Sequence, residues 1–222
     1  MKRNLLIAFC LIFFAFEANA QIFSVGSNRR EVALTFDDGP SGKYTEMVLN
    51  TLKKYNAKAT FFIIGRKAIQ YPEQLKKLAA DGHELGNHTF FHSRLNWISD
   101  AKLLDEIEMT TNFISGITKK RCSIFRAPHG YLSLHKAKLI EQKGYKIIQW
   151  SINAGDFYRT KSGVNNSDLI YKKVMSRVRG GDIILMHDVS QQTVNALPRI
   201  IKNLTDRGYK FVTVSRLLGL NI

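Results

Sequence analysis

Short apolar runs alternate with amphipathic stretches along nearly the whole chain, and this order limits the folds that it can adopt. Seven runs have the length and side chains of β-strands: residues 31–36, 59–64, 83–87, 123–126, 146–150, 182–186 and 209–214. Helical patterns lie between them: residues 44–55, 72–80, 133–142, 168–178, 193–205 and a long stretch that opens at Ser99. No linker or repeat interrupts the order, so we expect one parallel α/β domain, either a barrel of seven or eight strands or a doubly wound sheet.

Residues 1–20 have the composition of a secretory signal peptide. Lys2 and Arg3 precede an apolar run over residues 5–16, and Ala18 and Ala20 form the small-residue pattern of a cleavage site. The run is shorter than the ~20 residues that a membrane-spanning helix needs. We therefore expect cleavage after Ala20, a catalytic domain over 21–222, a secreted or periplasmic location and no stable membrane anchor. An uncleaved anchor is the alternative.

The chain is strongly basic, with 33 Lys and Arg against 18 Asp and Glu and a formal net charge of +15. Such a charge predicts attraction to polyanions. On an exported protein it favours anionic envelope polymers and argues against nucleic acid. The cations are spread over the predicted helices with only short clusters, such as residues 119–121, so a solvated basic surface is the ordinary interpretation.

Cysteine usage excludes an intramolecular disulfide in the mature chain. Cleavage removes Cys10 and leaves Cys122 alone, at the entry to a predicted strand. We expect Cys122 to be a buried structural residue.

Two adjacent carboxylates, Asp37 and Asp38, follow the first predicted strand directly, and Gly39 and Pro40 come next. Parallel α/β folds place their sites at the carboxyl ends of strands. Neighbours on a strand point to opposite sides, so the pair can act together only if a turn intervenes. One carboxylate could then bind a metal while the other acts as a base; the alternative is a turn in which the pair only caps backbone amides.

Two histidines, His88 and His92, follow the third predicted strand at a spacing of four. This spacing places both imidazoles on one face of a helical turn, where they can bind one divalent ion. Two imidazoles and one carboxylate form a three-ligand set of the open catalytic kind. The spacing alone is weak evidence, since two unrelated histidines would match it equally well.

Two further groups also follow strands. Arg126, Pro128 and Gly130 offer a guanidinium, a rigid turn and a close backbone approach. His187 ends a buried strand, and Asp156 lies just beyond another, where it could orient His187 and stabilise its charge.

These segments, taken in order, resemble the five motifs of the polysaccharide deacetylases, the family with the NodB homology domain that is also called carbohydrate esterase family 4. The matching segments are residues 35–40, 88–93, 126–131, the stretch around Asp156 and residues 185–188. The resemblance spans about residues 30–218, and the tail 193–218 is most similar to peptidoglycan N-acetylglucosamine deacetylases. It implies a distorted (β/α) barrel of about seven parallel strands in a single domain, and metal-dependent removal of N-acetyl groups from a sugar.

The resemblance also implies a role for each site residue. Asp38, His88 and His92 would hold the metal, zinc by preference, with cobalt, nickel or manganese as alternatives. Asp37 would be the base, paired with Arg126, and His187, charged by Asp156, would protonate the departing amine. The remaining substrate contacts are assigned by the same resemblance: the Tyr131 N–H to the oxyanion, Leu185 to the acetyl methyl, and Pro128, Gly130 and Phe157 to the pocket.

The fourth motif departs from the family pattern, because Asn153 and Phe157 stand where the family usually has Asp and Trp. The wall of the acetyl pocket thus loses an indole, which Trp150 or Tyr158 could replace. The expected substrate is N-acetylglucosamine in cell-wall glycan. Alternatives are the same chemistry on chitin oligosaccharide, exopolysaccharide, acetylxylan or a lipid-linked sugar, or a non-catalytic basic protein that binds glycan or polyanions.

Overall fold

The structure, a computed structural model, describes residues 21–157 and 166–220. Its strands are β1 (Glu31–Gly39), β2 (Ala59–Ile63), β3 (Glu84–Asn87), β4 (Ile124–Phe125), β5 (Lys146–Ile147), β6 (Ile152–Asn153), β7 (Ile183–His187) and β8 (Lys210–Phe211). Its helices are α1 (Lys43–Lys54), α2 (Gly65–Gln70), α3 (Pro72–Ala80), α4 (Asp100–Thr118), α5 (Leu134–Gln142), α6 (Ser167–Met175), α7 (Gln191–Asp206) and α8 (Val214–Leu217). Two 3₁₀ turns, η1 (Leu95–Trp97) and η2 (Pro128–Gly130), lie in loops.

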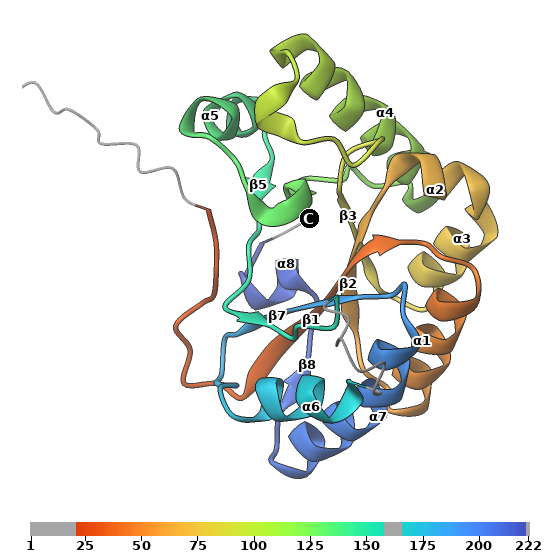
Figure 1. Cartoon of the computed structure of the whole chain (residues 1–222), viewed down its shortest axis with the longest axis vertical. Helices are drawn as coiled ribbons and strands as arrows, with labels where there is room; N and C mark the ends of the chain where they lie inside the picture. Colours follow the sequence, from red (N-terminus) through yellow and green to blue (C-terminus); the bar gives the residue numbers. More distant parts are fainter. Residues whose placement is uncertain (1–20, 158–165, 221–222) are drawn as a thin grey trace, which may run out of the picture.

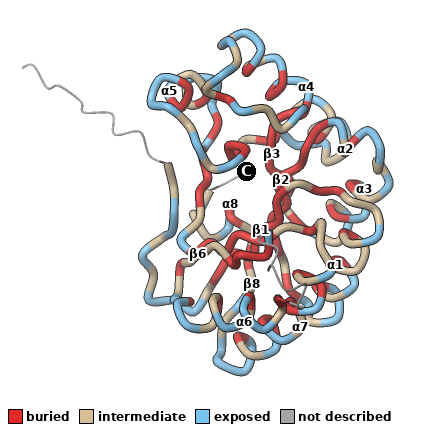
Figure 2. The backbone as a smooth tube through the Cα atoms, in the orientation of Figure 1, coloured by how far each residue is buried: buried red, intermediate tan, exposed pale blue. Residues whose placement is uncertain are grey.

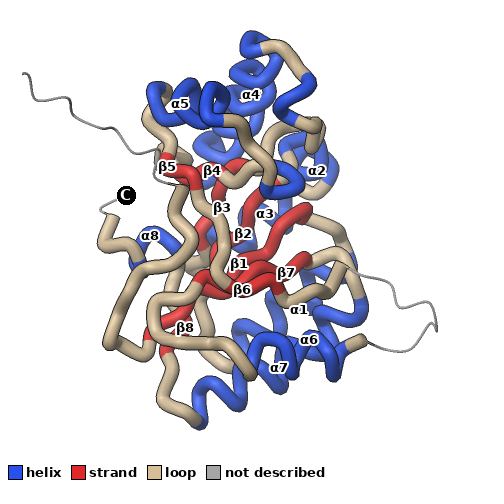
Figure 3. The backbone as a smooth tube through the Cα atoms, turned by 60° about the vertical axis from the view of Figure 1, so that its left-hand side comes forward, coloured by secondary structure: helices blue, strands red, loops and turns tan. Residues whose placement is uncertain are grey.

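The strands form one parallel sheet in the order β5-β4-β3-β2-β1-β7-β6, and β8 pairs with the start of β1. Most helices lie outside the curved sheet (Figures 1 and 3). The N-terminal segment lies along the open side of the sheet: Ile22 bridges Ile148, just after β5, and Ser24 bridges Asp182, just before β7. The architecture is a distorted (β/α) barrel in one domain, which confirms the expectation of about seven parallel strands.

The alternation of side chains along β1 separates two cores. Val32, Leu34 and Phe36 point outward into the larger core, which the surrounding helices cover. Ala33 packs on the inner side with Phe62 of β2. Figure 2 shows the buried backbone concentrated in these central strands. The inner side of β1 therefore also carries Thr35 and Asp37 into the interior of the barrel.

The observed elements differ from the predicted ones mainly in short helices and strands and in where strands end. The sequence pattern does not predict β6, α2 or α8, and it makes the strands at 146–150 and 209–214 too long. Cys122 is buried as expected, and burial raises the pKa of its thiol to about 12. Within the described ranges, no helix is both long and apolar enough to cross a membrane. The predicted signal peptide (1–20) and Tyr158 lie outside the described residues.

Candidate active site

The end of β1 places Asp37 and Asp38 together. The sequence predicts that the strand stops at Phe36 and turns, but β1 continues to Gly39, and its pairing with β2 shifts between Asp37 and Gly39. This bulge puts Asp38 at φ 72°. Both carboxylates consequently line the same hollow rather than pointing to opposite sides of the sheet.

His88 and His92 lie on the loop after β3, and the predicted helical turn is wrong. Thr89 and His92 have positive φ angles of 61° and 62°, which no helical turn contains. The loop is fixed by its own side chains: the Thr89 N–H donates to Asn87 Oδ1 at 2.8 Å, and the His92 N–H donates to Thr89 Oγ1 at 3.1 Å. The imidazoles still converge, with ring centroids 5.0 Å apart.

Asp38, His88 and His92 present three ligand atoms that lie within 4.8 Å of one another. Asp38 Oδ1 is 3.1 Å from His92 Nε2 and 3.5 Å from His88 Nε2. His88 Nδ1 lies 2.8 Å from the carbonyl oxygen of Arg126, which orients the ring and leaves Nε2 toward Asp38. Burial alone would raise the pKa of Asp38, but the two imidazoles outweigh it and hold that pKa far below its usual range.

Arg126 is fully buried and crosses the interior of the barrel. Its Nη1 donates to Thr35 Oγ1 and to Asp37 Oδ1, both at 2.7 Å. Its Nε and Nη2 donate to the carbonyl oxygens of Ile148 and Gln149 at 3.2 and 2.9 Å. The guanidinium carbon lies 4.0 Å from the centroid of the Phe62 ring. Arg126 therefore holds the Asp37 carboxylate in place from the interior of the barrel.

His187 ends β7 and lies opposite Asp37 in the parallel register. Its Nδ1 is 2.9 Å from Asp156 Oδ1, and its backbone N–H donates to Asp156 Oδ2 at 2.7 Å. Thr193 also donates to Asp156 Oδ2, at 2.6 Å. Burial alone would lower the pKa of His187, but the hydrogen bond and the charge of Asp156 outweigh it, and the pKa is raised to about 9.

These side chains surround one hollow of about 200 Å³ at the carboxyl ends of the strands. Of the residues singled out in the sequence, it is lined by Asp37, Asp38, His88, His92, Gly130, Phe157, Leu185 and His187. Asp156 and Arg126 lie behind His187 and Asp37. Pro128 and Tyr131 line a neighbouring hollow instead.

Three lining residues are not among the predicted site residues: His129, Trp150 and Asn153. The His129 ring lies 4.6 Å from that of His92, and it sits between two residues that the sequence singled out, which is the only signal for it. Trp150 lies in the same wall as Gly130, where a Cβ would come within 2.3 Å of the indole. Trp150 thus supplies an indole to this hollow, as the sequence allowed.

Two larger hollows share lining residues with this one. One, of about 350 Å³, is lined by Arg94, Trp97 and Tyr131 and shares His129 with the central hollow. The other, of about 620 Å³, is lined by Tyr44 and Gln191 among others and shares Phe157 and His187. Trp97, Tyr131 and Phe157 are 80%, 76% and 69% exposed.

The burial of Arg126 predicts a large effect of its removal on stability. In Arg126→Met, Asp37 stays buried without its charged partner, and we expect the free energy of unfolding at pH 7 to fall by about 3–5 kcal/mol. Denaturant unfolding measures this loss. Arg94→Met, at an exposed position, is the control and should change stability by less than about 0.5 kcal/mol.

A double variant separates lost charge pairing from lost packing. Asp37→Asn combined with Arg126→Met should recover part of the loss, because a neutral amide needs no cation. A loss below about 1 kcal/mol in Arg126→Met alone would contradict the account of Arg126 as a buried counter-ion.

Comparison with known proteins supports the fold and identifies the family. The family model of polysaccharide deacetylase matches residues 24–148. A peptidoglycan-N-acetylglucosamine deacetylase of Bacillus cereus is 38% identical over 199 residues, which are 88% of this chain and 92% of that protein. A solved peptidoglycan N-acetylglucosamine deacetylase superposes with a TM-score of 0.84 at 33% identity, covering 90% of this chain and 92% of the other.

A pseudoenzyme of the same family from Bacillus anthracis also superposes, with a TM-score of 0.82 at 27% identity, covering 90% of this chain and 69% of the other. The fold alone therefore does not decide activity, and the side chains of the site must carry that argument. From the family match, the sequence identity and the shared barrel, the chain belongs to the polysaccharide deacetylase family.

Proposed function

We propose that this protein is a metal-dependent hydrolase that removes acetyl groups from N-acetylglucosamine in cell-wall glycan. The observation that carries the proposal is the convergence of Asp38, His88 and His92 beside the buried Asp37–Arg126 pair. The substrate class is supported by the relatives, which are named peptidoglycan-N-acetylglucosamine deacetylases. The predicted signal peptide supports a secreted or periplasmic location, where such a glycan lies.

The three proposed metal ligands fit a divalent cation. Asp38 Oδ1 is buried, and although both imidazoles lie close to it, it makes no well-formed hydrogen bond among the described residues, which is costly unless another partner satisfies it. Two imidazoles and one carboxylate suit zinc in an open site, with cobalt, nickel or manganese as alternatives. A zinc ion held here would lower the pKa of a water to near 7 and polarise a carbonyl oxygen.

Asp37 is proposed as the base that takes the proton from the attacking water. Its Oδ1 is occupied by Arg126, and its Oδ2 lies 3.8 Å from His88 Nε2, at the edge of the ligand cluster. The hydrogen bond from Arg126 holds the Asp37 carboxylate in place, with Oδ2 left free to face the water. Its hydrogen bond to Arg126 therefore keeps Asp37 from acting as a metal ligand, while its other oxygen still lies next to the three proposed ligands.

His187 is proposed as the acid that protonates the departing amine. Its pKa of about 9 keeps the ring charged near neutral pH, and Asp156 holds Nδ1 so that Nε2 can face the substrate. The N–H of Tyr131 has no acceptor among the described residues and is proposed to bind the oxyanion. Leu185 and Phe157 line the hollow in which the acetyl methyl would lie.

The two flanking hollows favour a polymer over a single sugar. A glycan chain passing the central hollow would extend into both of them. The exposed rings of Trp97 and Tyr131 on one side and Phe157 on the other offer flat apolar faces to sugar rings. Pro128 lines the hollow that contains Trp97 and Tyr131, and Gly130 lines the central hollow.

Acetate release tests the proposed function directly. We expect the protein to release acetate from peptidoglycan more readily than from chitin oligosaccharide or acetylxylan, and to lose activity with chelator. His88→Ala combined with His92→Ala should lose both bound metal and at least about 10³-fold in turnover, because the metal and the base act as a unit. His135→Ala, at an exposed position on α5, is the matched control and should keep both.

Two outcomes would contradict the proposal. One is acetate release that persists in the double variant or in chelator. The other is metal bound at full stoichiometry without acetate release from any of the three substrates.

The pH profile tests the role of His187. The acid must be protonated, so activity should fall as pH rises through the pKa of His187. Asp156→Asn removes the group that contributes most to the raised pKa, ahead of Asp37 and Asp38, and the alkaline limit should therefore move to lower pH, toward the ordinary value of about 6.5. Turnover measured from pH 6 to 10 gives the limit.

Asp100→Asn is the control for this experiment, since Asp100 pairs with His135 and Lys136 on the outside of the barrel. It should leave the profile unchanged. An alkaline limit that stays in place in Asp156→Asn would exclude His187 as the acid.

A further inference from the structure

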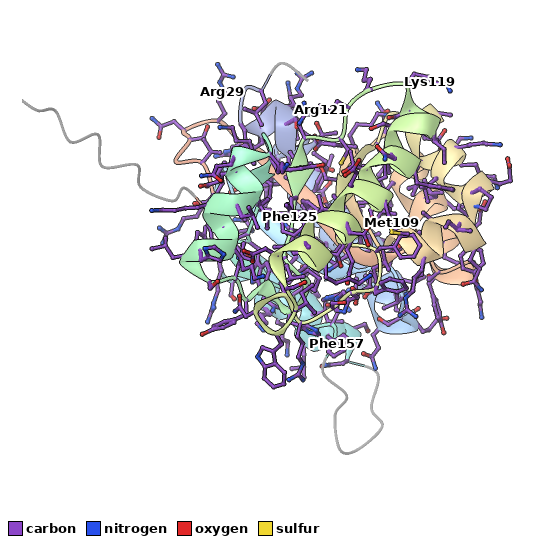
Figure 4. The ribbon with its side chains drawn as sticks, turned by 90° about the horizontal axis from the view of Figure 1, so that it is seen from above. Arg29, Met109, Lys119, Arg121, Phe125 and Phe157 are labelled. Carbon is purple, nitrogen blue, oxygen red and sulfur yellow. The ribbon has the colours of Figure 1, made fainter. Side chains whose placement is uncertain are left out.

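A group of positively charged side chains lies at the end of the barrel opposite the candidate active site. We call this end, where the strands begin, the rear face. Figure 4 shows Arg29, Lys119 and Arg121 along it and Phe157, at the mouth of the site, on the opposite side. The cations that look scattered in the sequence are thus brought together by the parallel topology, which sends every strand start to the same end.

Two hollows indent the rear face. One, of about 310 Å³, lies at the starts of β3 and β4 and includes Lys120 and Arg121. The other, of about 550 Å³, lies at the starts of β1, β2 and β8 and includes Lys58, Lys210 and Arg216. The hollows share Gly82 and Thr213, so they form one depression bordered by five cations.

The cations of the depression are not neutralised by partners. None of the five forms an ion pair within the described ranges, although Lys58 Nζ donates to the Asp81 carbonyl oxygen at 2.5 Å. Glu84 is occupied by hydrogen bonds from Thr60 and Ser215. Glu31, at the rim of the second hollow, is the other acid among the lining residues.

More positive charge surrounds the depression. Lys53 and Lys54 end α1, Lys119 follows α4, and Arg207 follows α7; all four are exposed. Helix C-termini favour cations, at about 0.3–1 kcal/mol each, and this explains part of the pattern. It does not explain Lys58 or Lys210, which lie at strand starts.

The depression also offers neutral donors. Ser123 lines the first hollow; its hydroxyl oxygen is itself buried and has no hydrogen-bond partner among the described residues. Thr213 also lines this hollow, whereas the Ser215 hydroxyl already donates to Glu84. Cations interspersed with hydroxyl donors suit the oxygens of phosphate groups.

We propose that the rear face binds a linear polymer that carries repeated phosphate groups. No exposed large apolar side chain of the described ranges lines either hollow, so insertion into a membrane surface is not favoured. Binding here leaves the opposite end open, so the protein can be retained on an anionic envelope polymer while its candidate active site stays accessible. The proposal goes beyond the proposed deacetylation and does not depend on it.

The test measures binding of long-chain inorganic polyphosphate to the purified protein by calorimetry. Lys120→Gln, Lys210→Gln and Arg216→Gln are combined in one rear-face variant, because these side chains are exposed and form no side-chain hydrogen bond or ion pair within the described ranges. We expect its dissociation constant to rise by about tenfold or more, and wild-type binding to weaken steeply with salt. Arg66→Gln, Lys102→Gln and Lys138→Gln form the control with the same loss of charge on the flanks, which should change binding by less than about twofold.

Equal weakening in the two variants would overturn the proposal, because net charge rather than the rear face would then be responsible. Binding that neither variant weakens would overturn it as well. Tighter binding to phosphatidylglycerol vesicles than to polyphosphate would assign the face to a membrane instead. An unchanged melting temperature in both variants shows that folding is not the cause.

Discussion

The buried pair of Arg126 and Asp37 is the interaction on which the candidate active site depends. The guanidinium donates to Thr35 and Asp37, two residues apart on β1 and therefore on the same side of the sheet. It also donates to two carbonyl oxygens of the chain near β5, so one side chain connects opposite parts of the barrel. A charge at such a depth is stable only with its partner in place. The same buried guanidinium therefore both positions Asp37 and holds the interior of the barrel together.

The metal-ligand cluster is built outward from this pair. The Arg126 carbonyl oxygen accepts a hydrogen bond from His88 Nδ1. Arg126 therefore positions the proposed base through its side chain and orients a proposed metal ligand through its backbone. The bulge at Asp38 then turns the second carboxylate toward the two imidazoles. Asp37 and Asp38 obtain separate roles because one lies in the regular strand and the other in the bulge.

Much of this arrangement could be predicted from the sequence, and the misses have physical reasons. Placing the polar motifs after strand runs predicts the convergence of Asp37, His88, Arg126 and His187, because parallel strands end together. The helical turn at His88 is wrong because Asn87 and Thr89 side chains hold a loop with positive φ angles, which spacing cannot reveal. Strand β6 is too short for a periodic signal, and His129 becomes a neighbour of His92 only through the fold.

The net charge is a second property whose spatial distribution the sequence alone does not reveal. Counting residues gives +15 but no location, and along the sequence the cations look dispersed. The barrel gathers many of them at strand starts and helix ends, on the side away from the mouth of the site (Figure 4). Chemistry and retention can therefore occupy opposite ends of one small domain.

The central claim is that Asp38, His88 and His92 hold a metal ion while Asp37 stays with Arg126. Anomalous diffraction at the zinc edge, from crystals grown with zinc, tests it most directly. The account predicts one peak bound by Asp38, His88 and His92, with the Asp37–Arg126 hydrogen bond intact. A peak coordinated by Asp37 with Arg126 displaced, or no peak at this cluster, would contradict it.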